Sequence, residues 1–246
     1  HSYDDPVHAP LGLRAARLYG QVSPDAGHAL HMTSHIFIAM GMWDEVIRAN
    51  KEAMRVVDAQ LAAMPNPPVK PPVGCHHNSQ WLLYGYLQQG KREEARSWLA
   101  LCRAQAEGEA ARIAPDPIEP YRSALFVFAD MQARARIDMP DIAAADPTLP
   151  EGAFLPSRFT LLYGQAAAAW PRDPARLRAV AAQMRAMLPA VRTALATPPD
   201  YAAGVLPWLE RMADQVAALD LLAAGRRDEG LAALRKAAEQ EQAMPM

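Results

Sequence analysis

The chain has 246 residues, of which 51% are hydrophobic and 7% aromatic, and its formal net charge at pH 7 is −2. This length suffices for one large domain or two small ones, and the near-neutral charge provides no net basic field that would attract nucleic acid or anionic lipid. No stretch of about 18 apolar residues is free of charge, so no membrane-spanning helix is expected.

The sequence contains two cysteines, Cys75 and Cys102. Two cysteines define neither a disulfide framework nor a thiolate zinc site. Composition alone therefore favours two buried free thiols, and a bond between them is the alternative.

Helical spacing begins early in the chain. Residues 11–22 are predicted to form a first helix, with Pro10 in its first turn. A second helix spans Pro24 to Gly41 and reads PDAGHALHMTSHIFIAMG, ending on a glycine suited to a left-handed conformation. Residues 42–64 form a third helix, so the second and third helices make an antiparallel hairpin.

A proline-rich connector separates this hairpin from the next one. Residues 65–74, PNPPVKPPVG, hold five prolines and are incompatible with a helix or a central strand. Residues 76–90 and 91–108 are predicted to form a second helical hairpin, whose turn contains Gly90.

The remainder of the chain is also predicted to be helical. A long proline-containing loop is expected at 138–156, and such loops are often functional or mobile. Pro189 and Pro207 are expected to kink two of the helices. No segment alternates with period two, so the fold class is all-α. The expected helices are 120–138, 156–170, 173–196, 199–225 and a helical segment over 228–242.

The two hairpins share an internal repeat. When Gly41 is aligned with Gly90, Phe37 falls on Tyr86, and small or apolar residues follow at matching distances. A third copy fits around Gly225. These spacings resemble those of the tetratricopeptide repeat (TPR), which has a small residue between its two helices and an aromatic residue four positions earlier. The aligned positions after the glycine are Val46 with Ala95, Asn50 with Leu99, and Ala53 with Cys102.

The repeat departs from the TPR pattern in places. Trp43 and Arg92 replace the usual tyrosine after the glycine, and Gly230 replaces an alanine. The resemblance nevertheless implies a TPR-like α-solenoid of stacked antiparallel hairpins. Histidine-rich repeats would occupy residues 1–110, and further hairpins ending in a degenerate repeat would occupy residues 111–246.

Histidines are the most informative residues of the chain, because all seven lie within residues 1–77. At about 100° per residue, His28, His31 and His35 point to about 0°, 300° and 340° and share one helix face. In the alignment of the repeats on Gly41 and Gly90, these three histidines fall at positions that line the concave groove of a TPR protein. His77 would stand beside His28 across that groove, and the acidic N-terminal segment, residues 1–8, would fold over its mouth.

This concentration of imidazoles predicts a transition-metal site, with zinc or copper as the cofactor. His31 and His35 are one turn apart and could share an ion, whereas His28 and His35 are about 10 Å apart along the axis. His28 paired with His31 is one alternative; His77, a histidine of the N-terminal segment or an Asp could also complete the site. The candidate metal ligands are therefore His28, His31, His35, His77, His1 and His8.

Three other interpretations stay open. The histidines could be structural, capping helices or bonding to Asp4 and Asp5. The groove could instead bind a peptide, a partner protein or a small acidic ligand without metal. A metal-dependent hydrolase is the third, but no nucleophile elbow, P-loop, dinucleotide fingerprint or HExxH motif is present, which favours a protein that is not an enzyme. The candidate ligand-binding residues are Gln80, Tyr84, Arg14 and Arg17.

Three longer segments of the sequence resemble a known group of proteins. HSYDDPVHAPLGLRAARLY, then HALHMTSHIFIAMGMWDEVIRAN and HHNSQWLLYGYLQQG, are similar to a group of bacterial TPR proteins of poorly defined function. The resemblance covers about residues 1–95. It implies an exported or periplasmic protein, which would permit a bond between Cys75 and Cys102. It also implies further sequence at both ends, in keeping with a chain that begins without Met and ends without a helix cap.

Overall fold

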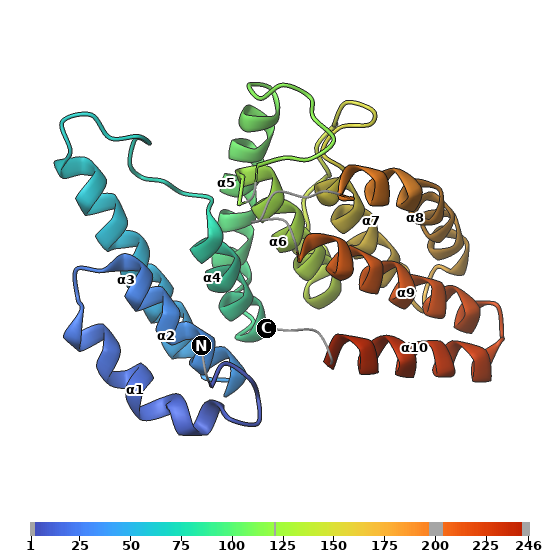
Figure 1. The fold of residues 1–246 in the computed structure, drawn as a ribbon, viewed down its shortest axis with the longest axis horizontal. Helices are drawn as coiled ribbons and strands as arrows, with labels where there is room; N and C mark the ends of the chain where they lie inside the picture. The colour runs from blue at the N-terminus through green and yellow to red at the C-terminus, as the bar shows by residue number, and fades with distance from the viewer. Residues whose placement is uncertain (1–2, 121, 197–203, 243–246) are drawn as a thin grey trace. The chain divides into compact units, whose positions relative to one another are not determined.

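The computed structural model describes residues 3–120, 122–196 and 204–242. Within these ranges the chain forms ten α-helices, one short 3₁₀ helix and no strand (Figure 1). The predicted all-α class is therefore confirmed. Over the same ranges, no helix combines the length and the apolar character needed to span a membrane.

The chain divides into two compact units, His1–Cys102 and Arg103–Met246. The helices of the first unit are α1 (Ala9–Val22), α2 (Gly27–Ala39), α3 (Trp43–Ala63), α4 (His77–Gln88) and the beginning of α5 (Arg92–Ala110). Successive helices pack side by side, α1 on α2, α2 on α3 and α3 on α4 (Figure 1). The second and third predicted helices thus form the expected hairpin.

Three helix-to-helix turns share one geometry. Gly41, Gly90 and Gly225 follow α2, α4 and α9 (Val205–Ala223), with φ values of 66°, 68° and 79°. An L side chain is strained at such angles, which accounts for glycine at each turn. The next N–H closes the turn on the carbonyl five residues earlier. These bonds join Met42 to Phe37 (2.8 Å), Lys91 to Tyr86 (2.9 Å) and Arg226 to Leu221 (3.0 Å).

Cys75 and Cys102 form a disulfide bond, with their Cα atoms 4.9 Å apart. The preference for two free thiols was wrong, and the bond that stood as the alternative is the one formed. Cys75 lies at the end of the proline-rich connector, just before α4, and Cys102 lies on α5. The fold brings these distant positions together, and the bond closes a loop of sequence separation 27 that contains α4 and about the first half of α5.

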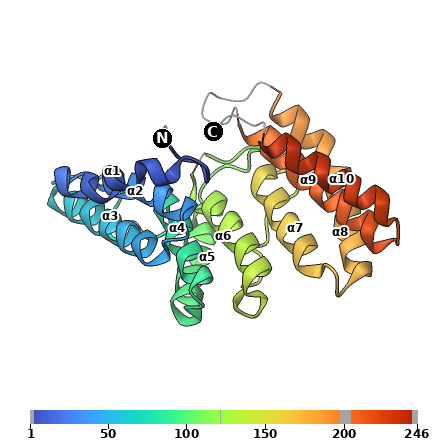
Figure 2. The same ribbon diagram turned by 90° about the horizontal axis from the view of Figure 1, so that it is seen from below.

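The described part of the second unit also contains helices and no strand. They are α6 (Ala124–Asp138), the 3₁₀ helix η1 (Pro140–Ile142), α7 (Leu155–Ala169), α8 (Pro174–Ala194), α9 and α10 (Arg227–Gln242). Figure 2 shows α7, α8 and α9 as neighbours, and each pair is in contact. Their facing sides bury an apolar core that includes Phe159, Leu177, Met184, Leu209 and Val216.

Two predicted features of this unit differ in detail. The helix expected over 199–225 begins at Val205, with Gly204 as its N-cap, and ends at Ala223, while residues 197–203 lie outside the described ranges. Pro207 is the third residue of α9, where no intrahelical N–H bond is lost, whereas Pro189 lies inside α8. Only Pro189 therefore lies in a helix interior, where a proline removes a backbone hydrogen bond and can kink the helix.

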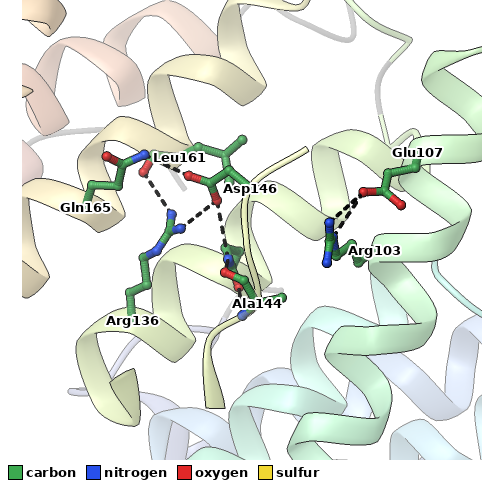
Figure 3. A network of polar contacts seen from close by, with 8 residues as sticks. Arg103, Glu107, Arg136, Ala144, Asp146, Leu161 and Gln165 are labelled. Carbon is green, nitrogen blue, oxygen red and sulfur yellow. Dashed lines mark hydrogen bonds and ion pairs between the residues drawn. The ribbon is translucent and has the colours of Figure 1, made fainter. Parts of the chain in front are cut away.

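The loop after η1 is held against α6 and α7 by polar contacts (Figure 3). Asp146 accepts hydrogen bonds from Arg136 at 2.7 Å and from Gln165 at 2.7 Å. The Gln132 side chain bonds both the carbonyl and the N–H of Ala144. These contacts fix the loop on the helices before and after it.

Replacing Asp146 with alanine is expected to lower the free energy of unfolding by about 1–3 kcal/mol, because Arg136, only 13% exposed, loses its carboxylate partner. Urea denaturation followed by circular dichroism measures the change. The matched control is Glu107→Ala, which breaks the exposed pair with Arg103 at 3.0 Å and should cost less than about 1 kcal/mol. Equal effects of the two substitutions would contradict this account of the loop.

Candidate metal centre

Three histidines of the first unit converge on one point. His31 and His35 lie one turn apart on α2, and His77 is the first residue of α4. One ligand nitrogen from each ring lies within 4.8 Å of the other two. His31 is fully buried, and the other two are half-buried. These three side chains lie close enough together to hold a metal ion.

The spacing can be compared with a zinc site. An ion at the centre of a triangle with 4.8 Å sides would lie at most about 2.8 Å from each nitrogen, whereas zinc–imidazole bonds are about 2.0–2.1 Å long. Each ring would therefore move inward by no more than about 0.8 Å on binding zinc. Small rotations of the side chains are sufficient, and α2 and α4 need not separate or approach.

The hydrogen bonds of His31 leave its Nε2 atom as the ligand atom. Asn50 donates from Nδ2 to the Val46 carbonyl at 2.9 Å, which directs its Oδ1 toward the ring. His31 Nδ1 lies 2.7 Å from that oxygen and must donate to it. The proton is thus on Nδ1, and Nε2 carries a lone pair. Nε2 is buried and has no hydrogen-bond partner in the part of the chain that the structure describes.

The other two rings show the same arrangement. His35 Nδ1 donates to Asp4 Oδ2 at 2.8 Å, so the N-terminal segment does reach α2. His77 Nδ1 donates to Gln80 Oε1 at 3.1 Å. In proteins, an oxygen that accepts from one imidazole nitrogen fixes the ring and leaves the other nitrogen for a metal. In all three rings Nδ1 meets an oxygen acceptor, which makes Nε2 the candidate ligand atom.

Burial keeps the imidazoles in the form that binds metals. It lowers the pKa of His31 to about 3, although the hydrogen bond to Asn50 acts in the opposite direction. Burial also lowers the pKa of His35, although the Asp4 carboxylate acts in the opposite direction. A metal ion binds neutral imidazole, so these rings need not lose a proton at neutral pH before they coordinate.

Trp81 forms one wall of this cluster. Its indole lies 4.2 Å from the His35 ring and 5.4 Å from the His31 ring, centroid to centroid. The His77 ring is 6.1 Å away. Because Trp81 is one turn beyond His77 on α4, the same helix face supplies both the ligand and the apolar wall.

The remaining candidate ligands lie elsewhere. His28 is exposed and its ring is 6.0 Å from that of His31, but it does not belong to the converging group. The expected neighbour of His77 was His28, whereas the structure places the His31 ring beside it, at 4.7 Å between centroids. His8 is exposed and bonds to Asp5 at 2.8 Å. His1 lies outside the described residues.

The candidate ligand-binding residues are spread over several surfaces. Gln80 contacts His77, as described above, and Tyr84 packs its ring against Trp43 with centroids 5.5 Å apart. Arg14 and Arg17 are exposed on α1. The structure does not bring these two arginines together with the histidines, since Arg17 lines a groove on the opposite side of α2.

Sequence reasoning missed two members of the centre, Asn50 and Trp81. Asn50 is a polar residue within an otherwise apolar stripe of α3, which was a usable signal for a buried hydrogen bond. Trp81 follows His77 by four residues, the spacing of side chains on one helix face. Asp4 was expected as a structural partner of the histidines, and an Asp was one alternative for the metal ligand set, but its role as the acceptor that orients the His35 ring was not predicted.

The buried histidines also predict how stability depends on pH. The unfolded chain takes up a proton at His31 near pH 6.5, but the folded chain does so only near pH 3, so lowering the pH favours unfolding. Between pH 7 and pH 5 the metal-free protein should lose about 2 kcal/mol from this residue alone. Urea denaturation in the presence of a chelator measures this loss.

The lowered pKa values of His35 and His76 act in the same direction. The variant His31→Gln keeps a polar group near Asn50 and should lose the part of the pH dependence that belongs to His31. An equal change in stability from pH 7 to pH 5 for the parent and for His31→Gln would contradict the burial of the His31 ring.

Comparison with known proteins gives no relative from which a function could be transferred. The chain matches no protein-family model, no curated protein and no solved structure.

Proposed function

We propose that the first unit binds one transition-metal ion, with zinc as the preferred metal, through Nε2 of His31, His35 and His77. The observation that carries the proposal is the convergence of three imidazoles whose Nδ1 atoms are each held by an oxygen acceptor. Imidazole suits zinc and copper, and three neutral nitrogen ligands leave a fourth position of a tetrahedral ion for water or another ligand. Copper(II) is the ion that would compete with zinc for this site.

The role of Asp4 favours binding over hydrolysis. A zinc hydrolase needs a carboxylate or similar base beside the bound water. Asp4 already accepts the hydrogen bond of His35, which assigns it to orienting that ring. The metal would therefore serve a scaffold, either by joining α2 to α4 or by presenting its open position to a ligand.

We further propose that this scaffold is TPR-like. The support is the identical turn geometry at Gly41, Gly90 and Gly225, with Phe37 and Tyr86 buried four residues before the first two of these glycines. The disulfide between Cys75 and Cys102 supports an oxidising compartment as the place of action, since such bonds persist there.

Isothermal titration of the full chain with zinc chloride tests the proposed metal site, using protein without a polyhistidine tag that has been treated with chelator. We expect saturable binding of one zinc per chain. Cobalt(II) should occupy the same site and give the intense visible absorption of a tetrahedral ion. Absence of saturable binding for zinc, cobalt and copper would overturn the proposal.

A further inference from the structure

A groove in the first unit lies away from the histidines. It is bounded by α1, α2 and α3 and has a volume of about 710 Å³. The residues of α2 that line it are Leu30, Thr33 and Phe37. At about 100° per residue, they face about 150° away from the mean direction of His31 and His35. The groove and the candidate metal centre therefore use opposite sides of one helix.

The floor of the groove is apolar. Its lining includes small and aliphatic side chains from all three helices, so an apolar body placed here would be removed from water on several sides. The floor residues, all of them buried, are Ala16, Leu30, Phe37, Ile47 and Ala49.

The rim, in contrast, carries an excess of positive charge. Arg55 is neutralised by Glu52 at 2.6 Å. Arg17, Arg48 and Lys51 also line the groove, and within the described ranges none of the three forms an ion pair with an acidic side chain. Lys51 instead lies over the Tyr86 ring, 5.5 Å from its centroid.

This local excess of positive charge contrasts with the formal net charge of the chain, which is −2. Several other arginines on helix surfaces are paired with a carboxylate, such as Arg96 with Glu93 at 2.6 Å and Arg192 with Glu210 at 2.8 Å. Three unpaired cations around one concave apolar surface provide a positive field for an anionic group. The groove thus offers an apolar floor and a cationic rim to the same ligand.

We propose that this groove binds a small amphipathic organic anion, with its apolar body on the floor and its carboxylate, or an equivalent anionic group, between Arg17, Arg48 and Lys51. The volume falls within the range of about 300–1,000 Å³ that is typical of small-molecule sites. The lining stretch of α3, from Ile47 to Arg55, is about 12 Å long. This length suits a medium-chain acyl group, and is short for a docked helix.

The proposal is independent of the metal site and is tested with decanoate on the full chain. Titration calorimetry is carried out in the presence of a chelator, so that a carboxylate cannot bind through a metal ion. Decanoate should bind with a stoichiometry of one, and the uncharged decanol should bind at least about tenfold more weakly, because one favourable charge contact is worth about that factor.

Two variants locate the site. Arg48→Gln combined with Lys51→Gln should weaken decanoate binding by about tenfold or more. Arg14→Gln is the matched control, because it removes one positive charge from α1 at a residue that does not line the groove, and it should change the affinity less than about twofold. Circular dichroism verifies that each variant is folded.

Several results would overturn the proposal. Equal affinity for decanoate and decanol would remove the role of the cationic rim. Unchanged decanoate binding in the folded double variant would place the anion elsewhere, and so would loss of binding in His77→Ala. No decanoate binding, together with binding of an acidic peptide, would assign the groove to a macromolecular partner.

Discussion

Replacing His77 with alanine is expected to weaken zinc binding by more than about 100-fold, since loss of an outer-shell partner alone costs 10–100-fold and His77 is assigned as a ligand. His77 is the ligand that α4 contributes, whereas α2 contributes His31 and His35. Its loss leaves two imidazoles on one helix, which cannot hold a tetrahedral ion with comparable strength. Competition with a chromophoric zinc chelator measures the change.

The matched control for this substitution is His28→Ala. His28 lies on the same helix as two of the ligands, and its ring is 6.0 Å from that of His31, but it is exposed and outside the converging group. Its removal should change zinc affinity less than about threefold. If His28→Ala abolished binding and His77→Ala retained it, the ligand set assigned here would be wrong.

Removing the disulfide, by the double substitution Cys75→Ala and Cys102→Ala, is expected to lower the free energy of unfolding by about 3–4 kcal/mol. The bond closes a loop of sequence separation 27, and the chain-entropy model gives this magnitude for such a loop. Urea denaturation of the double variant and of the parent protein measures the difference.

The reductant dithiothreitol provides the control. It should destabilise the parent by a similar amount and leave the double variant unchanged. Because Cys75 lies two residues before His77, zinc affinity should also fall in the double variant. An equally stable double variant with unaltered zinc affinity would show that the bond has no part in holding α4 in place.

Local features of the structure were predictable from the sequence because they depend on neighbours along the chain. The proline-rich connector ends α3 and precedes α4 as expected, since proline lacks the N–H that a helix requires. Gly41 and Gly90 occupy the left-handed positions that follow α2 and α4. Helical periodicity likewise placed His31 and His35 on one face of α2.

Contacts between elements that are distant in the sequence were harder to predict. The sequence offered several alternatives for the third ligand, and only the packing of α4 against its neighbours selects His77. For Cys75 and Cys102, composition favoured free thiols, and only the resemblance to TPR proteins permitted the bond that the structure shows. The bond from Asp4 to His35 depends on the path of the N-terminal segment, which has no periodic pattern to predict it.

The separation of Arg17 from the histidines has a similar cause. Both were expected in one groove, because the repeat frame fixes which side of α2 faces inward but not how α1 packs against it. In the structure α1 lies against α2 and, with α3, forms a separate basic groove. An arginine on an unrepeated helix could not be assigned to a surface without that packing.

Elemental analysis of the full chain tests the central claim most directly. The protein is purified without added metal, without chelator and without a polyhistidine tag, and its metal content is measured beside that of the double variant His31→Ala with His35→Ala. The account predicts about one zinc, or one copper, per parent chain and none in the folded double variant. A parent chain that carries no metal even after reconstitution, or a double variant that retains it, would contradict the account.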